Sequence, residues 1–390
     1  AAVTALVAQY MGAGRQQEAN YSLNQLFTIA LITGVGLGLV GYLLAPWLLQ
    51  LMVREGAVAD AAVLYLRVIF LGLPTMVIPG LFHFAFAATG DTLTPLLVNG
   101  VGTLVNIILD PFLVLGWGPF PRLGILGAAD ATVFAQGVAT LAFLGLFVRG
   151  KGPLRLEAAS LLPHWPWVKK ALKIGFPAAV GQSSTAFGFV VMTGVIGRLP
   201  NAEAALAGYG IADRILGILF IITDGLSTGL TTMVGQALGA GLMTRARELV
   251  RKGLGVLVLI LSGEATLLWL LRYPLVGLFI PGRGDVIQVG AGFIQAFAVG
   301  MPLLGVFFAA LAIYRGAGHN LPTMVLSMLR LWGLRIPLAY LLGFPLGWGA
   351  SGVWWGMSLS NVISGLAAGG LLARGSWQRS VIRSDPSPPR

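Results

Sequence analysis

The segment VAQYMGAG, residues 7–14, recurs as VGQALGAG, residues 234–241, at an offset of 227 positions (234 minus 7). Two later pairs keep nearly the same offset: the prolines Pro74 and Pro302, and the dipeptides Thr89-Gly90 and Ala317-Gly318. Three separate anchors at nearly one offset indicate an internal repeat, so we expect two homologous halves. Because the offset spans an even number of predicted helices, the two copies run parallel.

Long apolar runs fill both halves. The chain has 390 residues, of which 56% are hydrophobic and 10% charged, whereas soluble domains carry about 25% charged residues. The mean hydropathy is +0.85. Runs of about 20 apolar residues or more predict an all-α polytopic membrane protein, not a water-soluble enzyme or a membrane β-barrel. The predicted helices cover residues 1–11, 17–52, 57–88, 93–116, 124–148, 167–197, 203–238, 243–273, 285–315, 320–343 and 350–373.

The repeat also predicts the domain organisation. The second half opens near Lys170, two helices before its Gly-Ala-Gly turn. Applied to the first half, the same offset predicts about 57 residues ahead of Ala1 in a complete protein. We therefore expect two six-helix lobes, the first lacking its first helix and most of its second. The expected parts are an N-lobe (1–149), a cytoplasmic linker (150–166), a C-lobe (167–374) and a disordered tail (375–390).

The charge distribution predicts the orientation. The net charge is +11, which in so apolar a chain favours basic cytoplasmic loops over nucleic-acid binding. Sixteen Lys and Arg residues fall on one side of the predicted membrane and five on the other. This asymmetry places the Gly-Ala-Gly turns, the 150–166 connection and the C-terminus in the cytoplasm. There is no cysteine, and the three histidines share no metal-ligand spacing.

One predicted helix carries a polar face. Asn99, Thr103, Asn106 and Asp110 follow one another at intervals of four, three and four residues, which aligns them along one side of a helix. An ionisable group deep in a membrane helix normally faces a cavity or a partner. We interpret this face as a cavity lining that ends in an acid, in preference to helix packing.

Asp110 is the best candidate for ion coupling. A carboxyl group there can take up a proton from one side of the membrane and release it to the other. Alternatively, Asp110 and Asn106 can join threonine oxygens around a sodium ion, because hard cations take oxygen ligands. Pro111 lacks an N–H and therefore frees a backbone carbonyl nearby. No cofactor is expected besides the coupling ion.

Four stretches together resemble the multidrug and toxic compound extrusion (MATE) transporters. They are the paired turns VAQYMGAGR and VGQALGAG, NIILDP at 106–111, GAADAT at 127–132 and YGIADRIL at 209–216. The similarity extends from residue 1 to about residue 373. It implies two lobes that form a V, in a prokaryotic inner membrane, and export by alternating access driven by sodium ions or protons.

The resemblance also implies a cation site in the first lobe. By match to the family, Asn106, Asp110 and Thr132 would form it, with Thr103 alongside. The family's other acid at this site lies in the first helix, which the chain as given does not contain.

The second half departs from the family branch that couples through its second lobe. Aligning Pro337 with Pro111 places Ile336 opposite Asp110, and the segment after Pro177 reads QSST without an acid. Five side chains of this half could contact substrate or each other. Gln182 and Thr185 are candidates for the substrate cavity, together with Asn99 and Asp224, and Arg330 and Arg335 are expected to pair with acids. No role is assigned to Asp130 or Glu264.

Three functions fit these observations. The first is an ion-coupled exporter of small amphipathic organic cations that works as a monomer. The second is a lipid-linked oligosaccharide flippase of the same superfamily, which would need a strongly basic cavity for pyrophosphate. The acids Asp110 and Asp224 offset the positive charge of the arginines, so this function ranks second. The third is an inactive membrane scaffold, in which no activity would depend on Asp110.

Overall fold

The computed structural model describes residues 2–50, 56–149, 152 and 154–382. These residues are overwhelmingly helical and contain no strand, as the apolar runs predict. Within them, nine helices are long and apolar enough to cross a bilayer, and a bent pair counted as one span makes ten. The chain separates into two compact units, which are described one at a time.

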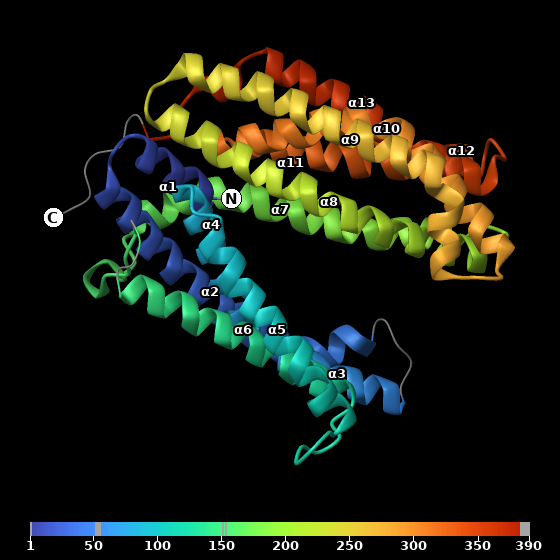
Figure 1. Ribbon diagram of the computed structural model, residues 1–390, viewed down its shortest axis with the longest axis horizontal. Helices are drawn as coiled ribbons and strands as arrows, with labels where there is room; N and C mark the ends of the chain where they lie inside the picture. The colour runs from blue at the N-terminus through green and yellow to red at the C-terminus, as the bar shows by residue number, and fades with distance from the viewer. Residues whose placement is uncertain (1, 51–55, 150–151, 153, 383–390) are drawn as a thin grey trace. The chain divides into compact units, whose positions relative to one another are not determined.

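The first unit covers Leu6–Ala171. Most of its helices are antiparallel neighbours joined by short turns (Figure 1): α1 (Ala2–Gly12), α2 (Gln16–Gln50), α3 (Ala57–Leu71), α4 (Leu73–Thr89), α5 (Leu93–Leu115) and α6 (Ile125–Val148). Glycines let α2 approach α3 and the start of α4 closely, as the G-x-x-x-G spacing predicts. A Cβ atom on Gly38 would lie 2.5 Å from the carbonyl oxygen of Phe70, and one on Gly34 would lie 3.1 Å from Cα of Pro74.

The single helix predicted over 57–88 is instead two helices, bent by 47° at their junction. Gly72 separates α3 from α4, and Pro74 follows in the first turn of α4. Proline has no N–H to donate, so the helical ladder is interrupted here. Gly72 itself packs against the side chain of Val133 on α6, which leaves no room for a larger residue at the bend.

The basic connection after α6 packs on α2. Gln25 donates from Nε2 to the carbonyl oxygens of Ser160 and Leu162, each at 2.8 Å. Asn24 donates to the carbonyl oxygen of Arg155 at 3.0 Å. These side chains supply hydrogen bonds that the irregular backbone lacks, so the described part of the connection has a defined path.

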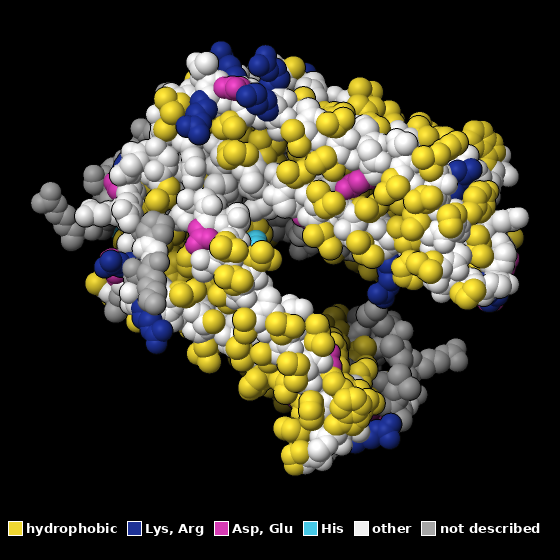
Figure 2. Space-filling view, viewed as in Figure 1, with side chains coloured by type: hydrophobic (Ala, Val, Ile, Leu, Met, Phe, Trp, Pro, Cys, Tyr) yellow, Lys and Arg dark blue, Asp and Glu magenta, His cyan; other side chains and the backbone are white. Residues whose placement is uncertain are grey.

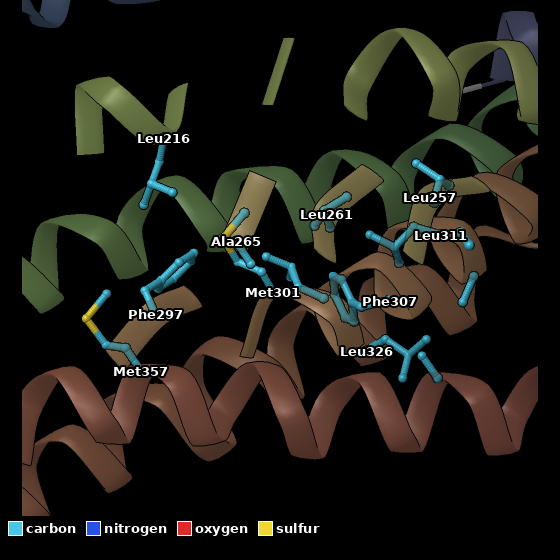
Figure 3. Close-up of a cluster of buried hydrophobic side chains, with 14 of the residues drawn as sticks. Leu216, Leu257, Leu261, Ala265, Phe297, Met301, Phe307, Leu311, Leu326 and Met357 are labelled. Atoms are coloured by element: carbon cyan, nitrogen blue, oxygen red, sulfur yellow. The ribbon is translucent and has the colours of Figure 1, made fainter. Parts of the chain in front are cut away.

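The second unit comprises residues 172–382 together with residues 2–5. Its helices are α7 (Trp165–Ile196, which starts in the first unit), α8 (Ala202–Gly239), α9 (Met243–Phe279), α10 (Gly284–Ala317), α11 (Asn320–Met328), α12 (Ile336–Gly343) and α13 (Gly349–Ala373). Helix α10 is central, because it packs against α8, α9 and α13. Of the 18-residue stretch of α10 with the highest hydropathy, 72% is buried. Its Phe297, Met301 and Phe307 meet leucines of α8, α9 and α11 in the core (Figure 3).

Two further helix predictions need correction. The helix expected over 320–343 is interrupted by a π-helical segment, Leu329–Arg335, between α11 and α12. The helix expected to end at 273 continues through Pro274 to Phe279. A proline removes one hydrogen bond and bends a membrane helix, but neighbouring helices can keep the helix intact.

The repeated motifs adopt the same local structure. Gly14 and Gly241 both have positive φ angles, 72° and 73°, a conformation that glycine adopts without steric cost. Each ends its helix with the same pair of hydrogen bonds, which for the first copy join Gly14 N to Met11 O and Arg15 N to Tyr10 O. Helices α9, α10 and α11 each begin 227 residues after α2, α3 and α5, respectively (243 minus 16, 284 minus 57, 320 minus 93).

The tail expected to be disordered from residue 375 is packed in its first part. Ser376–Gln378 form a 3-10 turn, and the Trp377 side chain is only 3% exposed. The hydroxyl of Tyr314 bonds to Ser376 Oγ at 2.7 Å, and the Trp377 indole donates to Leu372 O at 3.3 Å. The aromatic side chain explains the order, because it buries apolar area that a polar tail would not. Residues 383–390 of the predicted tail lie outside the described residues.

The surface is that of a protein embedded in lipid. Large apolar side chains are exposed along most of the long helices, for example Leu43 at 64% and Leu259 at 73%. Yellow side chains dominate the visible helix surfaces, and Lys and Arg gather mainly near helix ends (Figure 2). Such extensive exposed apolar area is unfavourable in water, so the chain is a multi-pass membrane protein.

Candidate functional site

The predicted polar face of α5 is present in the first unit. In the N-terminal part of α5, Asn99 Nδ2 lies 3.2 Å from Nδ1 of His83 on α4, and Thr103 donates to the carbonyl oxygen of Asn99 at 3.0 Å. Further along the helix, Asn106 Nδ2 and Asp110 Oδ1 are buried and have no hydrogen-bond partner among the described residues. Buried polar atoms without partners are costly, so these two atoms are available to a ligand.

The neighbouring helix α6 carries Thr132. Gly102 on α5 packs against α6, and Gly127 on α6 packs against the end of α5. Thr132 lies between these contacts on its helix, and Asn106 and Asp110 lie between them on theirs. The Thr132 hydroxyl donates to a carbonyl of its own helix at 2.8 Å, which leaves its lone pairs as acceptors. No group of three or more His, Asp or Glu side chains gathers anywhere in the described chain.

The second unit contains a cavity of about 220 Å³. Side chains from α7, α8, α10, α13 and the π-helical segment line it. Its charged members are two acids and two arginines, and most of the rest are aromatic. The complete lining is Phe189, Tyr209, Asp213, Leu216, Phe220, Asp224, Phe293, Phe297, Leu304, Phe308, Arg330, Arg335 and Met357.

Helix α8 supplies the acidic side of this cavity. Tyr209, Asp213, Leu216, Phe220 and Asp224 follow one another at helical spacing, which turns all five to one face. The alignment of Asp213 and Asp224 on one face follows from the sequence, since eleven residues make about three turns. Both aspartates are solvent-exposed, and they face the same cavity. They can therefore contact a cationic group without a full desolvation penalty.

The π-helical segment supplies the basic side. Arg335 is 2% exposed and donates from Nη2 to Asn361 Oδ1 at 2.7 Å and from Nε to Ser360 Oγ at 3.2 Å. Arg330 donates from Nη1 to the same Asn361 oxygen at 3.3 Å. The guanidinium of Arg330 also lies 4.8 Å from the ring centroid of Phe307.

The prediction that these arginines pair with acids is confirmed only in part: Asp213 interacts electrostatically with Arg335, but no ion pair is formed. The ion pairs found in the described chain join Arg15 to Glu18, Lys252 to Glu248, and Arg283 to Glu203 and Asp285. Neither cavity arginine takes part in one. Both arginines donate instead to the neutral amide of Asn361 on α13, whereas the acids of the lining lie on α8.

Gln182 and Thr185 do not line this cavity. Thr185 donates to the carbonyl oxygen of Gly181 on its own helix at 2.8 Å. Between them, Ser184 Oγ accepts from the indole of Trp332 at 2.7 Å. One turn further along α7, Phe189 does reach the cavity. The substrate role of Gln182 and Thr185 stays a prediction.

The sequence reasoning missed Asn361 in the second unit and named Glu264 without assigning it a role. Asn361 is fully buried and accepts from both arginines, but a lone asparagine in an apolar helix gives no specific signal. Glu264 on α9 is 7% exposed, and neither of its carboxyl oxygens has a hydrogen-bond partner among the described residues. The spacing of Tyr209, Asp213 and Asp224 was a usable signal for the cavity face.

The comparisons with known proteins agree with one another. The MatE family model matches residues 1–112 and 177–341. A probable multidrug resistance protein NorM from Pseudomonas putida is 31% identical over 387 residues, covering 94% of this chain and 80% of its own length. A probable multidrug resistance protein NorM from Thermotoga maritima is 26% identical over 97% of this chain and 81% of its own length.

Solved structures share the fold. A crystal structure of MATE in complex with MaL6 superposes with a TM-score of 0.90 at 19% identity, over 97% of this chain and 84% of that chain. A MOP superfamily transporter from Pyrococcus furiosus, described as having a binding pocket of reverse polarity that suggests a different function, gives 0.88 at 20% identity, over the same shares of the two chains.

Proposed function

Because this chain belongs to the MatE family of multidrug and toxic compound extrusion transporters, we propose that it exports amphipathic organic cations by ion-coupled antiport. The family match over both halves carries the proposal. Relatives named as multidrug resistance proteins support drugs or drug-like molecules as the substrates. Alternating access of one cavity to the two sides of the membrane is the expected mode of transport.

Coupling is assigned to the first unit. The unpartnered Asp110 Oδ1 supports a role for Asp110 in binding the coupling ion, and the amide oxygen of Asn106 would add a neutral ligand. Thr132 and Thr103 would add neutral oxygens, and the ion is a proton or a sodium ion. A single acid that gains and loses a cation, as the site opens to each side in turn, would link inward ion flow to outward substrate flow.

Substrate binding is assigned to the second unit, with Asn99, Gln182 and Thr185 as further candidates. The exposed acids Asp213 and Asp224 support recognition of a positive group, and the aromatic lining supports a flat apolar body. The basic loop charges support a cytoplasmic C-terminus and an inner-membrane location. We expect the monomer to be the working unit.

The test is transport by the purified chain in proteoliposomes. Rhodamine 123, an amphipathic cation, should move against its gradient when a proton or a sodium gradient is imposed, and should stop when that gradient is collapsed. Comparing the two gradients identifies the ion. Flux that is the same with either gradient and with none would overturn the antiport proposal.

One observation favours the lipid-linked oligosaccharide flippase as a second candidate. The cavity contains two arginines, and a pyrophosphate-linked substrate needs positive charge. Asp213 and Asp224 in the same cavity oppose that substrate, because two acids would repel a pyrophosphate. Competition by a polyprenyl pyrophosphate in the transport assay separates the two: the flippase requires it, and the drug exporter does not.

A further inference from the structure

We infer that Arg330 and Arg335 form a binding site for a carboxylate group of the substrate, so that the second unit recognises amphipathic aromatic zwitterions as well as simple cations. This inference rests on the proposed export function and names part of its substrate class.

The π-helical segment brings the two arginines together. Residues five apart, such as Arg330 and Arg335, point about 140° apart on an α-helix, where each residue turns by about 100°. In a π-helix the hydrogen bonds join residues five apart, so these residues lie nearly above one another. Both side chains accordingly line the cavity, and both reach Asn361 Oδ1.

Neither arginine forms an ion pair in the described part of the protein. Asp213 interacts electrostatically with Arg335, but the charged neighbour of Arg330 is another cation, Arg335. The shared acceptor of the two arginines is one neutral amide oxygen. Arg330 Nε and Asn361 Nδ2 are buried without a hydrogen-bond partner in that same part of the chain. Buried charges are normally paired, because removing a guanidinium from water costs several kcal/mol. An anionic group bound in the cavity would supply the missing partner.

The chemistry and size of the cavity indicate which anion. Guanidinium groups match the planar fork of a carboxylate, to which they can donate two parallel hydrogen bonds. Five phenylalanines line the same space, which favours an aromatic ring beside the acid. At about 220 Å³, the cavity is smaller than the ~300–1,000 Å³ of pockets that enclose whole drug-sized molecules. It therefore fits an aryl carboxylate, with the rest of the substrate outside.

The acids define the other end of the substrate. Asp213 and Asp224 line the cavity from α8 and are exposed, whereas Arg335 lines it from the π-helical segment and is buried. A molecule with its carboxylate at the arginines and a cationic group at the aspartates would meet complementary charge at both ends. An ester of the same molecule would lose only the contact with the arginines.

Asn361→Asp provides a direct test. The substitution keeps the shape of the side chain and places a carboxylate where both arginines already donate, so the protein supplies its own anion. Folding should be preserved, with a melting temperature equal to or above that of the unaltered chain. The probes are rhodamine 110, which has a free aryl carboxylate, and its methyl ester rhodamine 123; their binding to the purified full chain is followed by fluorescence polarisation.

We expect Asn361→Asp to weaken rhodamine 110 binding by about tenfold or more, and rhodamine 123 binding by less than about threefold. Ser351→Asp adds the same charge at an exposed position of α13 away from the cavity, and it should change neither. Arg330→Gln should reproduce the selective loss, because it removes one of the two guanidinium groups.

Several results would overturn the inference. Equal rhodamine 110 affinity in the unaltered chain and Asn361→Asp would show that the arginines only join the π-helical segment to α13. Equal loss of both probes would show that the carboxylate is not what the arginines recognise. Binding of the ester but not of the acid by the unaltered chain would remove this inference and leave the export function standing. Failure of the unaltered chain to bind or transport the ester would overturn both the carboxylate site and the proposed export function.

Discussion

Arg335 and Asn361 are joined by a 2.7 Å hydrogen bond from Nη2 to Oδ1, and both side chains are almost completely buried. This bond connects the π-helical segment to α13. Since Arg330 donates to the same oxygen, one amide serves two cationic side chains. Asn361 is therefore the residue on which the basic side of the cavity depends.

Asn361→Ala should destabilise the protein. The change removes the acceptor shared by two buried guanidinium groups, and hydrogen bonds to charged groups are worth about 1.5–3 kcal/mol each. We expect a loss of about 2–4 kcal/mol, visible as a lower melting temperature of the purified protein. Ser351→Ala, at an exposed position of the same helix, should leave the melting temperature unchanged. An unchanged value for Asn361→Ala would mean that the arginines find other partners.

Asp110→Asn should abolish gradient-driven export without unfolding the protein. The amide keeps the size of the side chain but cannot exchange a proton and carries no charge for a sodium ion. Vesicles containing the variant should bind rhodamine 123 yet show only the flux seen without a gradient. Asn106→Ala should have the smaller effect, because it removes a neutral ligand.

Asp91→Asn is the control for Asp110→Asn. Asp91 accepts from Thr94 N at the start of α5 at 3.0 Å, and asparagine serves that capping position equally well. Its transport should be normal. If Asp110→Asn also exports at the full gradient-driven rate, ion coupling belongs elsewhere, and Glu264 becomes the next acid to test.

Asp224→Asn should change which cations are exported. Asp224 is exposed at the cavity, where one carboxylate contributes about 0–1 kcal/mol to a charge pair. We expect about threefold weaker competition by monovalent cations against rhodamine 123, and no change for neutral competitors. Asp285→Asn, which changes an acid paired with Arg283 outside the cavity, should leave the ranking of competitors intact. Equal weakening of charged and neutral competitors would argue against a charge contact.

The orientation can be measured by cysteine labelling, because the native chain has no cysteine. Arg155→Cys lies in the basic connection, and Asn201→Cys lies between α7 and α8; both positions are exposed. In intact cells a membrane-impermeant maleimide should label position 201 and leave position 155 unlabelled until the membrane is opened. The reverse pattern would invert the predicted topology.

Gly38→Ala should destabilise the first unit, because the new Cβ atom would lie 2.5 Å from the carbonyl oxygen of Phe70. Overpacking of this kind costs about 1–3 kcal/mol. Gly36, half a turn away on the same helix, faces open space, and a Cβ atom added there would have no other atom within 4 Å. Gly36→Ala should therefore be neutral or slightly stabilising in a thermal melt. Equal melting temperatures for the two variants would show that α2 can move away from α3.

The helices and the repeat were predictable because both depend on local sequence. Apolar runs locate helices in a membrane protein with little help from tertiary contacts, and Gly14 and Gly241 recur with the same turn. The bend at Gly72 and the continuation of α9 past Pro274 were not predictable, since the effect of a proline depends on the helices packed around it.

The cavity was only half predictable. Asp213 and Asp224 lie on the same face of α8 because they are eleven residues, or about three turns, apart, so the spacing in the sequence predicts their placement. The shared face of Arg330 and Arg335 could not be predicted, because no sequence rule signals a π-helical turn. The spacing of an α-helix would place these two residues on different sides.

The π-helical turn also limits what can be learned by laying one half of the sequence over the other. Before the π-helical turn, the anchors of the repeat keep an offset of 227 or 228 residues, and α11 begins 227 residues after α5. A π-helical turn takes up about one extra residue, which rotates everything after it by about 100°. Beyond Leu329 the same column of an alignment points to different neighbours in the two halves. A substitution tolerated at the end of α5 is therefore no guide to tolerance in α12.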